Sequence, residues 1–312
     1  MSVNERDFIK ESIKSDFRVD ARGRLAFRHL DIRFGTSNGQ ALLKLGRTQV
    51  STQASLKLMQ PQGGKPNEGN FKFNVEFSSL MHGCENAGMN ITLQEMRVDI
   101  SRFIDKVLKS SRAIDRESLC IVQGRLVWSL QVDLFVINED GNLVDACFIA
   151  ALACLMNTKL PEVTLAGPHK IRINDQKLRN LNVHHIPVCT SFYFIDGVPA
   201  SKPVVDASAK EEKLAKSRLS ICMNIFEDLC GMTTLGSLEV SPRILMSCTQ
   251  TALQLTKDLT KRLRDSYQSR SSLSLLDFSL STSSAIAKAN ESSAKDFLSS
   301  LFTGASPAEQ AT

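Results

Sequence analysis

Residues 143–156, Leu-Val-Asp-Ala-Cys-Phe-Ile-Ala-Ala-Leu-Ala-Cys-Leu-Met, form a run in which almost every side chain is small or apolar. A helix that is apolar all round must be covered on most of its surface, so this run predicts a buried central helix. The turn-forming sequence Glu139-Asp-Gly-Asn142 stands directly before it. Asn142 and Asp145, three residues apart, resemble a reciprocal cap at the start of this helix. Layers of other elements must therefore enclose residues 143–156.

Two stretches before this helix alternate apolar and polar residues. Residues 71–77 place Phe and Val between Lys, Asn and Glu, and residues 126–136 repeat the pattern over a longer stretch. A period of two is typical of strands that bury one face. Between them, a second helix is predicted from about Thr92 to Ser110, because its apolar residues fall on one side of a helical wheel. The first half is therefore predicted to be α+β.

The second half is predicted as a smaller α+β segment. It contains strands near 187–195 and 219–225, and a terminal helix that Ser241 caps and that Pro242 begins. We predict a first half at 1–160, a connector at 161–185, a second half at 186–265 and a tail at 266–312. The tail is rich in serine and poor in aliphatic residues, so we expect it to be disordered.

Composition narrows the class of protein. The chain is 42% hydrophobic and 23% charged, as is usual for a soluble globular protein, and its net charge of +5 permits a nucleic-acid surface without requiring one. The eight cysteines include no C-x-x-C pair, so we expect reduced thiols inside the cell and neither disulfides nor a metal site. The N-terminus is too charged for a signal peptide, no run is apolar enough for a membrane span, and no cofactor is predicted.

A series of ordered motifs resembles one protein family over residues 1–265. The motifs are Arg18-Val-Asp-Ala-Arg-Gly-Arg24, Lys44-Leu-Gly-Arg-Thr48, Phe73-Asn-Val-Glu-Phe-Ser78, Glu117-Ser-Leu-Cys-Ile121, Asp140-Gly-Asn142, His184-His-Ile-Pro-Val-Cys189, and Val205-Asp206 followed by Glu211-Glu212. Their order and spacing resemble the RNase PH-like ring subunits of the RNA exosome, most closely the type of the smaller polymyositis/scleroderma autoantigen.

This resemblance implies a fold, partners and a location. The fold would be the α+β RNase PH fold, with two βαβ-containing halves similar to the second domain of ribosomal protein S5. Six such units, contributed by different subunits, would form a hetero-hexameric ring around an RNA channel, together with S1/KH cap subunits and a hydrolytic exoribonuclease. The chain would occur in the nucleus, including the nucleolus, and in the cytoplasm, without a membrane partner.

The same resemblance argues against catalysis. Active family members carry Gly-Thr-Arg after the Asp-Gly of the strand-to-helix turn, where a helix N-terminus, a hydroxyl and a guanidinium can hold phosphate. The aligned positions here are Asn142, Leu143 and Val144. A lost charge-assisted hydrogen bond removes about 1.5–3 kcal/mol, and a lost transition-state donor costs ~10²–10³ in rate. Asp206 and Glu212 match the family's catalytic carboxylates and are interpreted as relics, or as partners for local backbone and basic groups.

The predicted helix at 92–110 carries a line of cations that suits a track of RNA phosphates. These RNA-binding candidates are Arg102, Lys106, Lys109 and Arg112, with Arg97 on the apolar side of the same helix. An ordinary solvated face, partly neutralised by Glu95 and Asp99, is the alternative interpretation. The arginines at 18, 22, 24 and 28 are interpreted as structural, with Asp20 and Asp31 as near partners.

The sequence thus predicts a non-catalytic structural and RNA-channel subunit of the exosome ring. An active phosphate-dependent 3′-to-5′ exoribonuclease and a free-standing RNA-binding adaptor are the alternatives.

Overall fold

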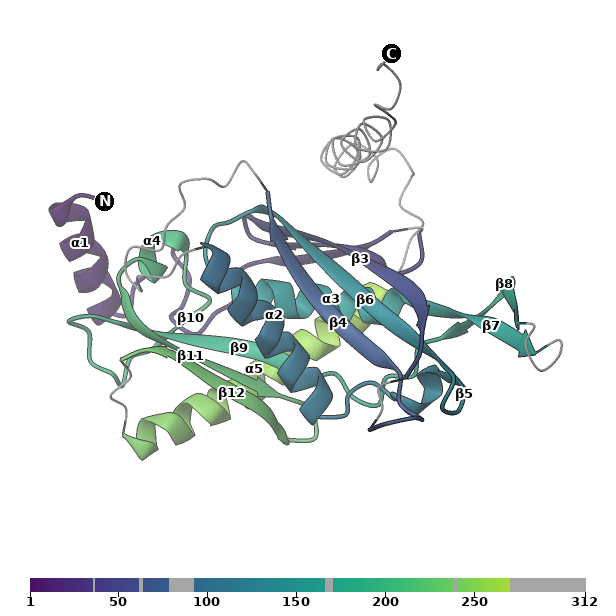
Figure 1. Cartoon of the computed structure of the whole chain (residues 1–312). Coiled ribbons are helices and arrows are strands. Elements are labelled where there is room, and N and C mark those ends of the chain that lie inside the picture. The colour runs from purple at the N-terminus through teal and green to yellow at the C-terminus, as the bar shows by residue number, and fades with distance from the viewer. Residues whose placement is uncertain (36, 62–63, 79–92, 166–170, 238–240, 270–312) are drawn as a thin grey trace, which may run out of the picture. The chain divides into compact units, whose positions relative to one another are not determined.

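The first of two main sheets contains the alternating stretches (Figure 1). We describe a computed structural model over residues 1–35, 37–61, 64–78, 93–165, 171–237 and 241–269. The sheet has the order β1-β2-β3-β6-β4, and β5 also pairs with β6. Its strands are β1 (Leu30–Phe34), β2 (Gln40–Leu45), β3 (Thr48–Met59), β4 (Asn70–Phe77), β5 (Cys120–Val122) and β6 (Leu126–Asn138).

The pair β4–β6 is parallel, whereas the other pairs of this sheet are antiparallel. Parallel neighbours need a crossover connection, and helix α2 (Leu93–Ser110) lies in that connection. The predicted strands and the predicted helix at 92–110 are therefore confirmed. The predicted apolar face of α2 is also confirmed, since Ile100, Ile104 and Leu108 are buried.

The second sheet has the order β10-β9-β11-β12 with antiparallel pairs throughout. Its strands are β9 (Val188–Ile195), β10 (Val204–Val205), β11 (Ala215–Met223) and β12 (Leu229–Gly236). The strand predicted near 219–225 therefore begins earlier and ends earlier than expected. Asn224 ends it, because its side chain accepts hydrogen bonds from the backbone N–H groups of Phe226 and Asp228 and so stabilises a turn.

Helix α3 (Leu143–Asn157) lies between the two sheets and packs on β2 and β3 of the first and on β9 of the second (Figure 1). Every residue of α3 except Met156 is buried. A helix sandwiched between sheets has no solvated face, which is why its sequence shows no polar side. The predicted buried central helix is confirmed.

Four further helical segments lie within the described residues. They are α1 (Val3–Lys14), the one-turn 3-10 helix η2 (Glu117–Leu119), α4 (Ala209–Glu212) and α5 (Pro242–Gln268). Helix α5 packs on β9, β11 and β1. Ser241 precedes it as the N-cap residue and Pro242 begins it, but the Ser241 side chain makes no capping hydrogen bond. The helix also continues to Gln268, past the predicted start of the tail at 266; residues 270–312 lie outside the described residues.

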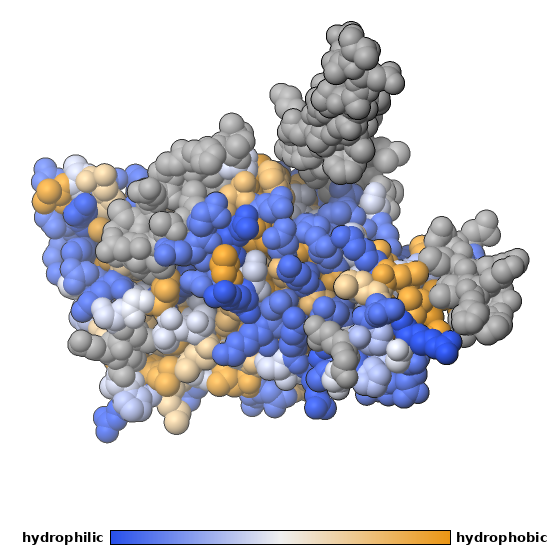
Figure 2. All heavy atoms as spheres, in the orientation of Figure 1, coloured by the Kyte–Doolittle hydropathy of each residue, from blue (hydrophilic) through white to orange (hydrophobic). Residues whose placement is uncertain are grey.

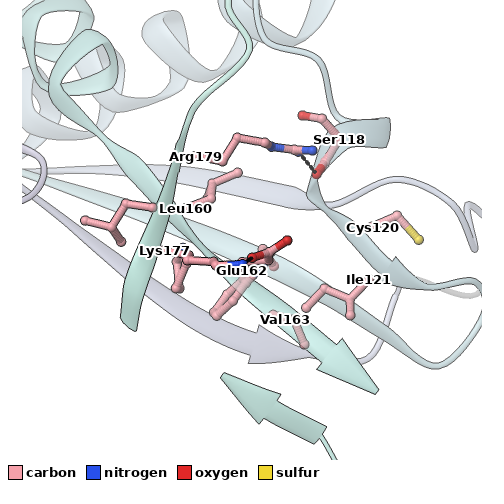
Figure 3. A pocket seen from close by; sticks show the side chains of 11 residues that line it. Ser118, Cys120, Ile121, Leu160, Glu162, Val163, Lys177 and Arg179 are labelled. Atoms are coloured by element: carbon pink, nitrogen blue, oxygen red, sulfur yellow. Dashed lines mark hydrogen bonds and ion pairs between the residues drawn. The ribbon is translucent and has the colours of Figure 1, made fainter. Parts of the chain in front are cut away.

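A two-stranded hairpin, β7 (Lys159–Leu165) and β8 (Ile171–Asn180), begins two residues before the predicted connector at 161–185 and otherwise lies within it. A cavity of about 680 Å³ lies between this hairpin and the β5–β6 region (Figure 3). Arg179 donates a hydrogen bond to the carbonyl oxygen of Ser118 at 3.0 Å across it, and Trp128 and Leu178 contribute apolar walls.

The surface over α2 is mainly hydrophilic, whereas hydrophobic residues gather near β12 and beside the hairpin (Figure 2). Leu229 and Met232 of β12 are exposed, as is Leu178 of β8. No helix within the described ranges is both long and apolar enough to cross a membrane.

Candidate functional site at the first turn of helix α3

The turn between β6 and α3 contains two consecutive residues in the left-handed backbone region, Gly141 with φ 82° and Asn142 with φ 53°. A Cβ at position 141 would lie 2.5 Å from the carbonyl oxygen of Ala207, so only glycine fits there. The turn therefore packs directly against the segment that carries Asp206. This close contact brings together two motifs that are far apart in the sequence.

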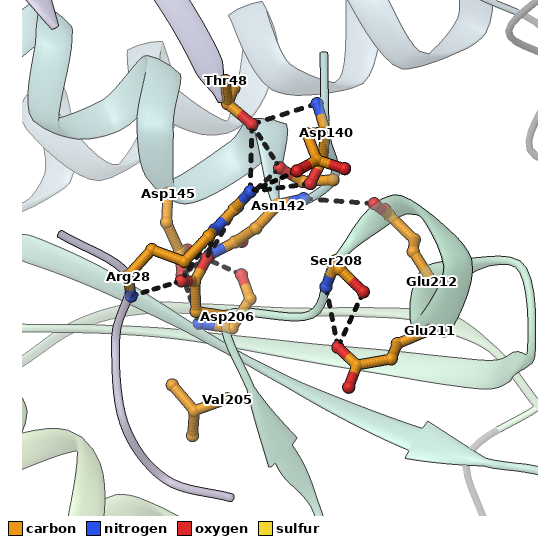
Figure 4. Close-up of polar contacts among 12 residues, drawn as sticks. Arg28, Thr48, Asp140, Asn142, Asp145, Val205, Asp206, Ser208, Glu211 and Glu212 are labelled. Atoms are coloured by element: carbon orange, nitrogen blue, oxygen red, sulfur yellow. Dashed lines mark hydrogen bonds and ion pairs between the residues drawn. The ribbon is translucent and has the colours of Figure 1, made fainter. Parts of the chain in front are cut away.

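Asp206 is fully buried, and its carboxylate accepts hydrogen bonds from side chains and from the backbone N–H of Arg28, the latter at 2.7 Å (Figure 4). Its Oδ1 accepts hydrogen bonds from Arg28 Nη2 at 2.9 Å and from Asn142 Nδ2 at 2.8 Å. Its Oδ2 accepts from Arg28 Nε at 3.0 Å and from Arg22 Nη1 at 2.9 Å. Burial opposes ionisation, but the hydrogen bonds and charge of Arg28 outweigh it and lower the pKa of Asp206.

Arg28 also holds the turn in place. Its Nη1 donates to the carbonyl oxygen of Asp140 at 2.7 Å and its Nη2 to that of Gly141 at 2.9 Å. The hydroxyl of Thr48 donates to the same Gly141 oxygen at 3.0 Å. A guanidinium that is committed to a carboxylate and two carbonyls has few donors left for a phosphate.

Glu212 faces the same turn and is also buried. Its Oε2 accepts the backbone N–H of Asn142 at 3.1 Å, and its Oε1 lies 3.9 Å from Arg218 Nη1. Burial raises the pKa of Glu212, although Arg218 and the Asn142 N–H oppose this. The interpretation of Asp206 and Glu212 as partners of local backbone and basic groups agrees with these contacts.

Asp145 makes contacts that differ from the predicted reciprocal cap. Asn142 has left-handed backbone and its side chain makes no capping hydrogen bond, so the prediction was wrong. Instead, Asn142 Nδ2 donates to Asp145 Oδ2 at 3.0 Å, and Asp145 accepts from the Ser191 N–H at 2.9 Å and the Ser191 hydroxyl at 2.6 Å. Burial raises the pKa of Asp145 to about 6 against these hydrogen bonds. The pair joins α3 to β9.

Leu143 and Val144 occupy the two positions where active relatives are expected to hold phosphate. Each is only 2% exposed, and both belong to the main hydrophobic core. The side chains of this first turn therefore stabilise the core and offer no hydroxyl or cation at those two positions.

The predicted RNA-binding residues have different surroundings. Arg102 and Lys106 are exposed on α2 and have no hydrogen bond or ion pair with a described residue. Lys109 lies 3.0 Å from Asp105 and 5.4 Å from the ring centre of Phe71, so its charge is partly used within the protein. Arg112 is exposed, and Arg97 is half-buried on the same helix. RNA contact by these residues stays a prediction.

The arginine cluster at 18–28 has mostly structural contacts, but sequence reasoning missed its main partners. Arg22 pairs with Asp20 as expected, whereas Asp31 pairs with Arg33. Arg18 instead donates to Glu211, and Arg28 to Asp206. These partners meet only in the folded chain. In the sequence, the basic cluster at 18–28 and the acidic pair Glu211-Glu212 were the features that could have indicated the pairing.

The chain matches the models of domain 1 of the 3′ exoribonuclease family at residues 26–161 and of domain 2 at 185–254. It resembles a solved structure described as the Archaeoglobus fulgidus exosome with RNA bound to the active site, with a TM-score of 0.71, 25% identity, and coverage of 83% of this chain and 97% of that one. The predicted α+β RNase PH fold is confirmed.

Curated relatives carry the name exosome complex component RRP45. RRP45A of Arabidopsis thaliana is 34% identical, over 86% of this chain and 87% of its own length. The protein of Schizosaccharomyces pombe is 31% identical, over 81% and 86%. The human protein is also 31% identical, but the chain spans only 59% of its length. The chain thus belongs to the RRP45 family of exosome components, within the RNase PH-type 3′ exoribonuclease family.

Proposed function

We propose that this chain is a non-catalytic ring subunit of an RNA exosome, where it holds the ring together and lines part of the path of the RNA. It would thereby support 3′-to-5′ processing and decay of ribosomal and other RNAs. Its RRP45 relatives are named as exosome components, and a structural neighbour is an exosome with RNA bound. The expected ring partners are other RNase PH-like subunits.

One observation supports the proposed absence of catalysis: the protein's own groups occupy the turn where active relatives are expected to hold phosphate. Leu143 and Val144 face the core, and the Asp206 carboxylate is bound to Arg28, Arg22 and Asn142. Phosphorolysis brings two anionic groups together and therefore needs free donors and cations. Converting Asp206 into a free catalytic carboxylate would leave the buried charge of Arg28 without its partner, at a cost of several kcal/mol.

A phosphorolysis assay tests this proposal. The purified chain, alone and together with its RNase PH-like ring neighbours, is incubated with single-stranded RNA and inorganic phosphate. We expect no phosphate-dependent release of nucleoside diphosphate. Release by the chain alone would favour the alternative of an active exoribonuclease.

Assembly is tested separately, by affinity purification with mass spectrometry and by size-exclusion of native extract. We expect co-purification of the RNase PH-like subunits, the S1/KH cap subunits and a hydrolytic exoribonuclease. Migration near the monomer mass without ring partners would instead favour a free-standing RNA-binding adaptor. Imaging of the tagged chain checks the proposed location in nucleus, nucleolus and cytoplasm.

A further inference from the structure

A cavity of about 320 Å³ opens where α2, the first turn of α3 and the strands β11 and β12 meet. It lies on the α2 side of the first turn of α3, and neither Asp206 nor Glu212 is among the residues that line it. Its lining comprises Asp99, Ile100, Arg102, Phe103 and Lys106 of α2, Val144 of α3, Arg218 of β11, and Met232, Thr233, Thr234 and Leu235 of β12.

Arg218 is the unusual member of this lining. Its side chain is only 8% exposed, and its Nε is a buried nitrogen that has no hydrogen-bond partner among the described residues. The contact of Nη1 with Glu212, at 3.9 Å, is longer than a hydrogen bond. A guanidinium stays charged in proteins and presents five N–H donors, so a buried one with unused donors is costly unless a ligand accepts them.

Two more cations face the same space from α2. Arg102 and Lys106 are spaced by four residues and therefore lie on one side of the helix. Neither pairs with a residue in the described part of the chain. Among the described residues of the lining, Arg102, Lys106 and Arg218 are cations and Asp99 is the one carboxylate. Glu212, which is not one of these lining residues, lies 3.9 Å from Arg218 and balances part of its charge.

We propose that this cavity binds a phosphate group, with Arg218 as its buried anchor and Arg102 and Lys106 at its mouth. A planar guanidinium matches two phosphate oxygens, and the surrounding apolar side chains strengthen the attraction by excluding water. On the proposed function, on which this inference rests, the group is a phosphodiester of the RNA backbone. We expect this site to bind RNA without cleaving it, because Asp206 and Glu212, which match the family's catalytic carboxylates, do not line the cavity.

Isothermal titration calorimetry of the full chain tests the proposal with two probes, sodium phosphate and a ten-nucleotide oligoadenylate without a terminal phosphate. Sodium chloride at matched ionic strength controls for general screening. Arg218→Met keeps the length and apolar stem of the side chain but removes the donors. Lys216→Met is the matched control, because Lys216 is an exposed cation on the same strand that does not line this cavity.

We expect Arg218→Met to weaken binding of at least one probe by about tenfold or more, as for loss of a charge-assisted hydrogen bond, and Lys216→Met to leave it within about twofold. An effect on oligoadenylate alone identifies a backbone phosphodiester as the ligand, and an effect on phosphate alone identifies the free ion. If the wild-type chain binds neither probe, or if Arg218→Met binds both as the wild type does, the proposal is wrong.

Arg218→Met removes a buried group, so two milder variants guard against misfolding. Lys106→Met changes an exposed side chain and should still weaken binding, while Arg218→Lys keeps the charge and should bind between the wild type and Arg218→Met. If Lys106→Met and Arg218→Lys both bind the probes as the wild type does, the proposal is wrong, even if Arg218→Met is unfolded and cannot be tested. Co-purification of Lys106→Met with ring partners is scored separately, so failure of this site is distinguishable from failure to assemble.

Discussion

The guanidinium of Arg28 and the carboxylate of Asp206 form a two-pronged ion pair, with Nε 3.0 Å from Oδ2 and Nη2 2.9 Å from Oδ1, between residues 178 positions apart. The pair ties the segment before β1 to the segment after β10 and fixes the turn that begins α3. The carboxylate that active relatives are expected to use in chemistry is thereby bound to an arginine of the same chain.

Breaking this pair should destabilise the protein strongly. Asp206→Asn leaves the buried Arg28 charge without its anion, and we expect a loss of about 3–5 kcal/mol in the free energy of unfolding, measured by urea denaturation. Asp196→Asn is the control, because Asp196 forms an exposed pair with Lys10 and should cost no more than about 1 kcal/mol. Equal effects of the two changes would contradict a structural role for Asp206.

Glu139 should make stability depend on pH. Burial, and then the nearby Glu212, raise its pKa from 4.5 to about 7, and its buried Oε2 has no hydrogen-bond partner in the part of the chain that the structure describes. The folded chain therefore holds this proton more tightly than the unfolded chain, and the unfolding free energy falls as pH rises from about 4.5 to about 7.

Glu139→Gln removes this titration. The unfolding free energy of the variant relative to the wild type should therefore rise by about 1–3 kcal/mol between pH 5 and pH 8. Urea denaturation at the two pH values measures it. The exposed Glu227, which pairs with Lys257, gives the control Glu227→Gln, for which we expect a change within about 0.5 kcal/mol at both values. A Glu139→Gln advantage that is the same at pH 5 and pH 8 would contradict the assignment.

Restoring the Thr-Arg part of the family triplet should not restore catalysis. Leu143→Thr with Val144→Arg supplies a hydroxyl and a guanidinium, but Asp206 stays bound to Arg28, and the new arginine would share a cavity with Arg218, Arg102 and Lys106. We expect no phosphate-dependent release of nucleoside diphosphate by the folded double variant. Robust release would show that the apolar pair alone had silenced the site.

Charge reversal on α2 should change how RNA binding depends on salt. Each cation that neutralises a phosphate on single-stranded RNA contributes about 0.7 to the slope of log K against log salt. Arg102→Glu with Lys106→Glu should therefore weaken RNA binding by the assembled complex and flatten the slope by about one or more, measured by fluorescence anisotropy.

Lys109→Glu should have a smaller effect, because Lys109 already pairs with Asp105. Lys261→Glu, at an exposed position of α5, is the control for net charge. A slope that is unchanged by the double reversal would remove Arg102 and Lys106 from the path of the RNA.

The buried thiols should resist alkylation. Burial raises the pKa of Cys147 and of Cys154 to about 12, so the reactive thiolate is scarce at pH 8. Cys120 is partly exposed and serves as the reference. Mass spectrometry after iodoacetamide treatment should find Cys120 labelled first, and Cys147 and Cys154 labelled only after unfolding; simultaneous labelling in the native protein would contradict their burial.

The sequence by itself determined the elements that depend on local pattern. The order of residues indicates which side chains must leave water. It predicted the period-two strands at 71–77 and 126–136, the amphipathic helix at about 92–110 and the largely apolar helix at 143–156, and the structure has strands and helices at these positions. The sequence also predicted the loss of the phosphate-binding Thr-Arg pair, because Leu143 and Val144 stand at those positions and neither carries a hydroxyl or a cation.

Only the tertiary structure decided which charges meet. Arg28 contacts Asp206 and Arg18 contacts Glu211 because the folding of the two sheets around α3 brings together segments that are nearly two hundred residues apart in the sequence. Arg218 resembles any strand arginine in the sequence, and its burial beside α3 depends on which face of β11 packs inward. Ion pairing acts over a few ångströms of space, so its partners depend on the folded chain and not on spacing along the sequence.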